Sequence, residues 1–162
     1  MGVSGSGKST VAEHLAARLG WRYVDGDLFH PAGNVAKMSA GHPLTDEDRW
    51  PWLRAIAAEI DRLSTAGNRA VVACSALKRA YRDILVHGRD DVRIVFLEGT
   101  QDLIAKRLDA RKGHFMPPGL LDSQFRTLEP PQPRERPVTV SIEAPVETII
   151  DDVIRQLDLI AS

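Results

Sequence analysis

The first residues of the chain form a pattern that binds phosphate. Residues 2–9, Gly-Val-Ser-Gly-Ser-Gly-Lys-Ser, satisfy the consensus G-x-x-x-x-G-K-[ST]. Its glycines let backbone N–H groups turn toward an anion, and the following helix directs its positive end at the same point. In this pattern the Lys reaches the β- and γ-phosphates of ATP, and the next hydroxyl binds Mg²⁺. We therefore assign Lys8 to catalysis and Ser9 to the metal. The loop residues expected to bind the nucleotide are Gly2, Ser4, Gly5, Ser6, Gly7, Lys8, Ser9 and Thr10.

A Gly/Ser-rich flexible terminus could match this consensus by chance. That alternative is disfavoured because an apolar helical face, residues 11–19, begins at the place the pattern requires. Gly20 then ends this helix.

Two carboxylates flank Gly26 at the end of a short strand-like segment, residues 21–24. Ligands of doubly wound sheets bind at the carboxyl ends of the strands. There, one carboxylate can hold magnesium through water while the other accepts the proton of an attacking hydroxyl. The alternative for Asp25-Gly26-Asp27 is an ordinary Asp-Gly turn.

Basic side chains gather in three further places. Singly, such residues belong to solvated helix faces, but beside a phosphate loop they could stabilise transferred charge or grip a carboxylate. They are Arg49; Lys78, Arg79 and Arg82; and Lys106, Arg107, Arg111 and Lys112.

The elements that must position these residues alternate between helix and strand, which predicts an α/β fold with a parallel sheet covered by helices. We expect one domain, residues 1–162, with a mobile, Pro-rich lid at about residues 112–133. Besides the elements named above, one helix is predicted from Thr45 to its end at Gly67-Asn68. Further helices are predicted at 77–86, 101–111, 118–127 and 146–159, and strands at 70–74, 92–97 and 138–142.

Composition excludes several classes of protein. The 21 basic and 22 acidic residues nearly cancel, which argues against nucleic acid as the main partner. No apolar run is long enough to span a membrane. Cys74 is the only cysteine, so an intrachain disulfide is impossible and a reducing, cytoplasmic location is expected.

Taken together, the chain resembles the bacterial gluconokinases over nearly its whole length. The phosphate loop is generic, whereas the segment 25–53 and the lid segment are specific. The matching runs are residues 2–9, 24–31, Asn34, 37–38, 41–53, 74–78, 114–117, 120–121 and 123–125.

This resemblance implies a shikimate-kinase-like P-loop kinase with a five-stranded parallel sheet and helices on both faces. It implies transfer of phosphate from ATP to D-gluconate, with magnesium, and a possible homodimer. The implied roles are acceptor contact for Asp27, magnesium for Asp25, substrate binding for Arg49, Lys78 and Arg82, lid closure for Arg111, and adenine contact for Arg107 and Pro145.

Two alternatives stay open: a kinase for shikimate or a related sugar acid, and a regulatory nucleotide-binding protein. A further expectation concerns residue 1. In folds of this kind an apolar strand leads into the phosphate loop, whereas here Met1 directly precedes Gly2. We expect the natural polypeptide to begin upstream with such a strand, because each unpaired buried backbone group costs about 1–3 kcal/mol.

Overall fold

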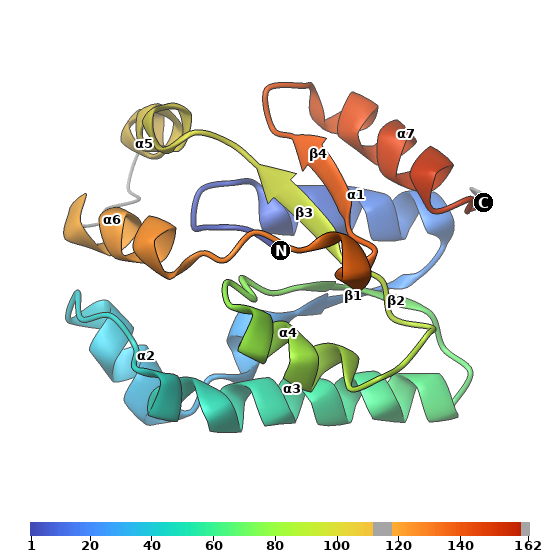
Figure 1. The fold of residues 1–162 in the computed structure, drawn as a ribbon, viewed down its shortest axis with the longest axis horizontal. Helices are drawn as coiled ribbons and strands as arrows, with labels where there is room; N and C mark the ends of the chain where they lie inside the picture. Colours follow the sequence, from blue (N-terminus) through green and yellow to red (C-terminus); the bar gives the residue numbers. More distant parts are fainter. Residues whose placement is uncertain (112–117, 160–162) are drawn as a thin grey trace.

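In the computed structural model, residues 1–111 and 118–159 are described, and helices alternate with strands along them (Figure 1). The elements in chain order are α1 Lys8–Leu19, β1 Arg22–Asp25, the 3₁₀ helix η1 Gly26–Phe29, α2 Ala32–Ser39, α3 Asp46–Thr65, β2 Ala70–Ala73, α4 Arg79–Val86, β3 Val95–Glu98, α5 Gln101–Ala110, α6 Pro118–Thr127, the 3₁₀ helix η2 Pro133–Glu135, β4 Val138–Ser141 and α7 Val146–Gln156.

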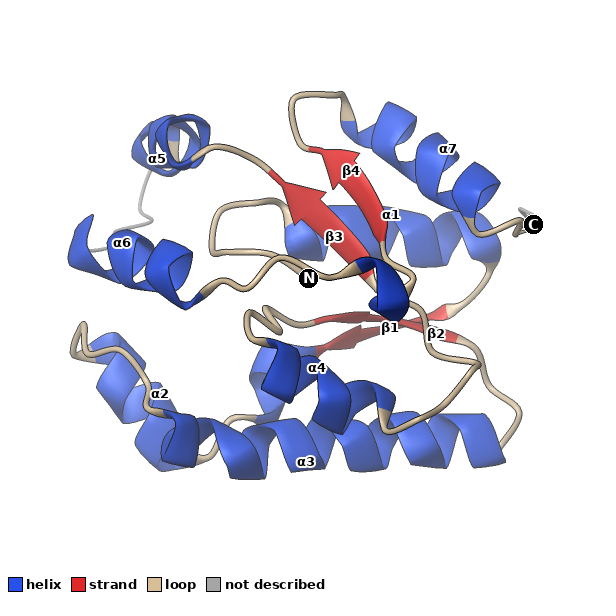
Figure 2. Cartoon of the chain, viewed as in Figure 1, coloured by secondary structure: helices blue, strands red, loops and turns tan. Residues whose placement is uncertain are grey.

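The strands form two parallel pairs, β1 with β2 and β3 with β4 (Figure 2). Arg22 is in register with Ala70, and Val95 with Val138. Helices cover both sides: in Figure 1, α3 and α4 lie below β1 and β2, α1 lies above this pair, and α7 packs on β4. The predicted fold class is therefore confirmed, and all four strands predicted from the chain are present.

Residues 1 and 2 connect the two pairs. The Met1 amino group donates to the Val95 carbonyl oxygen at 2.6 Å, and Leu97 N–H donates to the Met1 carbonyl oxygen at 3.0 Å. On the other side, Gly2 N–H donates to the Ser75 carbonyl oxygen at 3.2 Å. A cavity of about 640 Å³ lies beside this bridge and is lined by residues of both β2 and β3. The fifth strand that the resemblance implies is not among the strands described, and an upstream strand remains a prediction.

Helix α3 begins where its sequence indicates. Thr45 Oγ1 accepts from Asp48 N–H at 3.2 Å, and Asp48 Oδ2 accepts from Thr45 N–H at 2.9 Å. These two hydrogen bonds form a capping box, which satisfies donors that a helix start leaves free. Helix α2 was not predicted, because Asn34 is its only buried residue and it has no apolar periodicity to detect.

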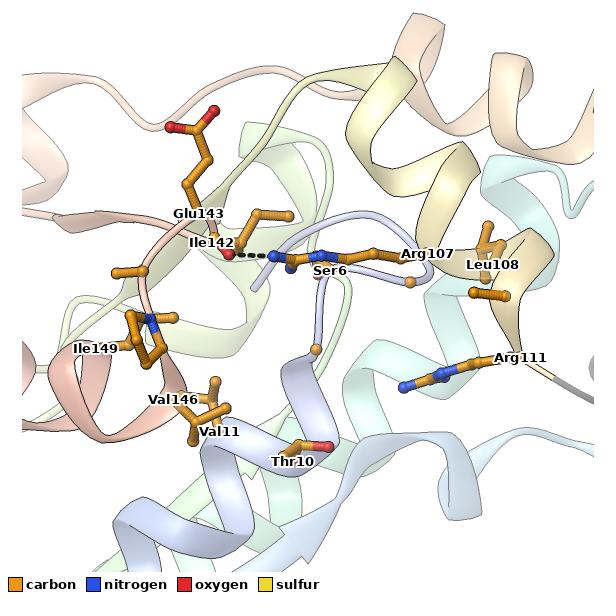
Figure 3. A pocket seen from close by; sticks show the side chains of 15 residues that line it. Ser6, Thr10, Val11, Arg107, Leu108, Arg111, Ile142, Glu143, Val146 and Ile149 are labelled. Carbon is orange, nitrogen blue, oxygen red and sulfur yellow. Dashed lines mark hydrogen bonds between the residues drawn. The ribbon is translucent and has the colours of Figure 1, made fainter.

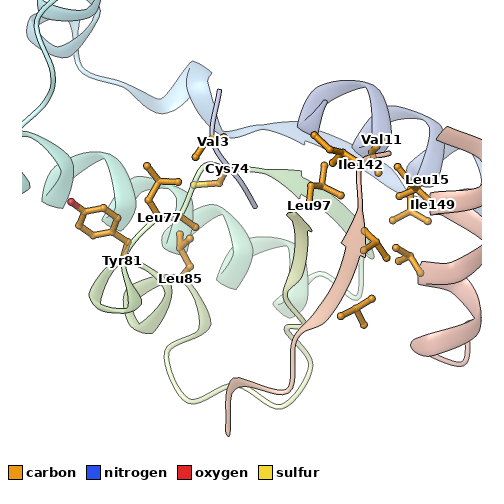
Figure 4. Packing of buried hydrophobic residues seen from close by; sticks show 14 of the residues in the cluster. Val3, Val11, Leu15, Cys74, Leu77, Tyr81, Leu85, Leu97, Ile142 and Ile149 are labelled. Carbon is orange, nitrogen blue, oxygen red and sulfur yellow. The ribbon is translucent and has the colours of Figure 1, made fainter. Parts of the chain in front are cut away.

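Buried apolar side chains hold the helices against the strands. Figure 4 shows one group around Leu77, Tyr81 and Leu85, and a second where Leu15 and Ile149 meet. This packing fixes the strand ends that carry the polar residues described below. In the described part of the chain, none of the helices is long and apolar enough to cross a membrane.

Candidate active site

The phosphate loop ends at an uncapped helix. Gly7 is the N-cap of α1 with φ of 91°, a left-handed conformation that favours glycine. Among the described residues no side chain caps this helix, so the N–H groups of its first turn keep their capacity to bind an anion. These free donors, with the helix dipole, fit a phosphate group.

Lys8 lies within electrostatic reach of both predicted carboxylates. Its Nζ donates to the Val3 carbonyl oxygen at 3.0 Å. Burial lowers the pKa of Lys8, while Asp27 and Asp25 act in the opposite direction. The structure thus brings together the lysine of the loop and the two carboxylates at the end of β1.

The two carboxylates of the segment Asp25-Gly26-Asp27 differ in their contacts. Asp25 Oδ1 accepts from Asp27 N–H at 2.9 Å, which caps η1 and holds Asp25 in place. A side chain at Gly26 would place its Cβ 2.5 Å from the Ala73 carbonyl oxygen, so only glycine allows this close approach to β2. The Asp27 side chain is 78% exposed.

A second cavity, of about 510 Å³, lies between the phosphate loop, the end of α5 and the start of α7 (Figure 3). Arg107 Nη2 donates to the Ile142 carbonyl oxygen at 2.6 Å and spans this cavity. Arg111 extends from the end of α5 toward the loop. The predicted nucleotide residues that line it are Gly5, Ser6, Gly7, Thr10, Arg107 and Pro145, together with the predicted catalytic Arg111.

A polar cluster joins the start of α3 to the start of α4. Lys78 Nζ lies 3.2 Å from both carboxylate oxygens of Asp46, and the Tyr81 hydroxyl donates to Asp46 at 2.5 Å. Arg49 Nη1 donates to the Tyr81 hydroxyl at 3.1 Å and to the Leu44 carbonyl oxygen at 2.6 Å. The hydrogen bond from Tyr81, with Lys78, lowers the pKa of Asp46. Hydrogen bonds to Tyr81 and Leu44 therefore hold Arg49 in place, and the ion pair with Asp46 holds Lys78.

Arg82 does not join this network, in contrast to its predicted role. Its side chain is 1% exposed and makes a two-point ion pair with Glu135 at 2.6 and 3.2 Å. Nη1 donates to the carbonyl oxygens of Ala76 and Leu77. With its donors engaged in this way, Arg82 ties α4 to η2, and the geometry favours a structural role over substrate binding.

Sequence reasoning missed Gln124 as a residue of the site. Its Oε1 accepts from Ser4 N–H at 2.6 Å, and its Nε2 donates to Ser4 Oγ at 2.9 Å. The sequence marked this segment as part of a lid, but no local pattern indicates a contact across 120 positions. Residues 112–117 of the predicted lid lie outside the described residues, and its remainder, which includes α6, packs against the loop through this contact.

Comparison with known proteins is consistent with this geometry. Residues 4–131 match the family model described as shikimate kinase. The chain is 46% identical to the gluconokinase of Gluconobacter oxydans (strain 621H), over 96% of this chain and 87% of that one. The chain belongs to the gluconokinase family. This confirms the resemblance noted in the sequence.

Solved structures of this family share the fold. A gluconokinase from Sinorhizobium meliloti 1021 superposes with a TM-score of 0.86 at 46% identity, covering 98% of this chain and 89% of the other. A sugar kinase from Janibacter sp. HTCC2649 gives a TM-score of 0.92 at 45% identity, covering 98% and 92%. Each match covers 98% of this chain, so the shared fold is not confined to the phosphate loop.

Proposed function

We propose that this protein transfers the γ-phosphate of ATP to D-gluconate, giving 6-phospho-D-gluconate and ADP. The observation that carries the proposal is that Lys8 of the phosphate loop lies within electrostatic reach of Asp25 and Asp27. A cation at the phosphate end of the nucleotide and a carboxylate beside it are the two groups that phosphoryl transfer to a hydroxyl requires. The gluconokinase relatives supply the identity of the acceptor.

In this proposal each carboxylate has one task. Asp27, exposed and free to rotate, accepts the proton of the acceptor hydroxyl as that oxygen attacks the γ-phosphorus. The leaving oxygen departs with the ADP product. Lys8 and Arg111 place positive charge beside the transferred group, where charge builds up in the transition state.

Magnesium fits the same place. Ser9 and Asp25 would hold it, since a hydroxyl, one carboxylate and phosphate oxygens are the ligands that this ion prefers. When bound, the ion neutralises charge on the β- and γ-phosphates. Asp25 is already oriented for this role by its hydrogen bond to Asp27 N–H.

We assign the acceptor to Arg49 and Lys78. The hydrogen bonds of Arg49 to protein groups use Nη1, and its Nε and Nη2 make none to described residues. This leaves a pair of donors for a carboxylate, the group that distinguishes a sugar acid from a sugar. Arg107 and Pro145 would lie against the adenine, in the cavity of Figure 3.

A panel of acceptors tests this assignment. Initial rates with D-gluconate, shikimate, other sugar acids and glucose separate gluconokinase from its nearest alternatives. We expect the highest kcat/KM for D-gluconate. Nucleotide binding without transfer to any acceptor would instead favour the regulatory protein considered from the sequence. The cytoplasmic location and the homodimer remain predictions, and light scattering of the purified protein tests the second.

A further inference from the structure

The imidazole of His30 is a buried polar group that the proposed mechanism does not use. Its side chain is 4% exposed and stacks on Trp52, with ring centroids 4.1 Å apart and an angle of 16° between the planes. Trp52 is itself fixed, because its Nε1 donates to the Gly26 carbonyl oxygen at 2.8 Å. The ring of His30 is therefore held between α3 and the loop that carries the two carboxylates.

Asn34 determines which ring nitrogen of His30 carries the proton. Asn34 Nδ2 lies 2.9 Å from the Asp48 carbonyl oxygen, which can only accept, so this atom must be the amide nitrogen. The same Nδ2 lies 3.2 Å from His30 Nδ1. Since an amide nitrogen only donates, Nδ1 must accept, and the proton of the neutral ring is on Nε2.

The protonated nitrogen faces Asp27. His30 Nε2 lies 4.0 Å from Asp27 Oδ1, and in the described part of the chain the Asp27 carboxylate has no hydrogen-bond partner. Burial lowers the pKa of His30, an effect that Arg49 strengthens and Asp27 opposes, so the neutral ring is favoured at neutral pH. A small rotation of the exposed Asp27 side chain closes the remaining distance to a hydrogen bond.

We propose that His30 is a positioning residue for Asp27: Nε2–H donates to one carboxylate oxygen and leaves the other free for the acceptor hydroxyl. The order of contacts is Asn34 to His30 to Asp27, with Trp52 supporting the ring. No proton is transferred along this series, because His30 only donates a hydrogen bond. The inference rests on the proposed function, in which Asp27 meets the acceptor.

The protonation state of the ring can be measured without turnover. In a ¹⁵N NMR spectrum of the wild-type protein, His30 Nε2 should have the shift and the attached proton of an N–H nitrogen, and Nδ1 the shift of a nitrogen with a lone pair. Asp27→Asn should move the Nε2–H resonance, because it changes the group that the N–H faces. A proton on Nδ1, or an Nε2–H resonance unaffected by Asp27→Asn, would overturn the inference.

Kinetics test whether the contact matters to the reaction. His30→Gln places an amide nitrogen near the position of Nε2, whereas His30→Phe keeps the stacking on Trp52 and loses the donor. We expect His30→Phe to lower kcat about 10- to 100-fold, the equivalent of one hydrogen bond to a charged group, with an unchanged KM for ATP. His30→Gln should retain most of the activity. Equal losses of kcat in the two variants would show that His30 only packs against its neighbours and would contradict the proposal.

A double variant separates this inference from the proposed function. If His30 acts through Asp27, His30→Phe should have little further effect in the Asp27→Asn background. The same fold-loss in both backgrounds would refute a role through Asp27. Should no sugar acid be phosphorylated, the proposed function fails, while the NMR measurement still decides whether His30 Nε2–H faces Asp27.

Discussion

Gln124 holds Ser4 by two hydrogen bonds, one to its backbone N–H and one to its hydroxyl. The first residue belongs to α6, within the predicted lid, and the second to the phosphate loop. The contact therefore couples the lid side of the molecule to the conformation of the loop. In a nucleotide-binding enzyme, such a clamp fixes the loop before ATP arrives and so lowers the ordering cost of binding.

Removing this clamp should weaken nucleotide binding. Two neutral hydrogen bonds contribute about 1 kcal/mol each, so Gln124→Ala should raise the Kd for a non-hydrolysable ATP analogue by roughly 10- to 30-fold. Gln124→Glu keeps the acceptor for Ser4 N–H and should give an intermediate value. Isothermal titration calorimetry measures both. Arg126→Ala, at an exposed position of the same helix, is the control, and equal Kd values for all variants would remove the clamp from the account.

Lys8→Ala should abolish transfer and weaken ATP binding without unfolding the protein. Burial lowers the pKa of Lys8, so the folded state disfavours its charged form and gains nothing in stability from it. The matched control is Lys106→Ala, at an exposed position. Initial rates and thermal denaturation of both variants measure activity and folding. Near-normal activity in a folded Lys8→Ala variant would contradict the kinase assignment.

Asp27→Asn and Asp25→Asn should fail in different ways. The first should lower kcat about 10²–10⁴-fold, the usual contribution of a general base, with little change in ATP affinity. The second should raise the magnesium concentration needed for half-maximal rate, because Asp25 is assigned to the ion. Magnesium titrations of both variants test this division, and identical behaviour would show that it is wrong.

Arg111→Ala should affect the rate more than binding. An arginine that meets transition-state charge contributes on the order of 10³-fold to kcat, whereas KM for ATP should change little. Arg155→Ala provides the control, since the Arg155 side chain is 72% exposed and its ion pair, among the described residues, is with Asp152. A kcat for Arg111→Ala within a few-fold of wild type would remove Arg111 from the site.

The Arg82–Glu135 pair should contribute to stability rather than to substrate binding. Arg82→Ala leaves Glu135 buried without its partner and should cost about 3–5 kcal/mol of unfolding free energy. Burial alone would raise the pKa of Glu135, but the hydrogen bonds from Arg82 outweigh it and the pKa is lowered. The stabilisation is therefore present above the ordinary Glu pKa and lost as pH falls through the lower, folded value. Urea denaturation of wild type and Arg82→Ala at several pH values measures this stabilisation. A raised KM for gluconate with unchanged stability would instead support the predicted role of Arg82 in substrate binding.

The features that could be predicted from the sequence are local ones. The phosphate loop, the pair Asp25 and Asp27, and the capping box at Thr45 each depend on residues a few positions apart, so their spacing already shows the geometry. The contacts of Arg82 and Gln124 could not be predicted in this way. Each depends on a partner 53 or 120 positions away. Whether such a side chain binds a ligand or another residue of the protein is decided by tertiary packing.

The product of the reaction tests the central claim most directly. Phosphorus NMR of the protein incubated with ATP, magnesium and D-gluconate should show a phosphomonoester on C6 of gluconate, formed in equal amount to ADP. Asp27→Asn under the same conditions should show little of either product. Release of inorganic phosphate with no ester, or an ester formed with shikimate but not with gluconate, would contradict the account.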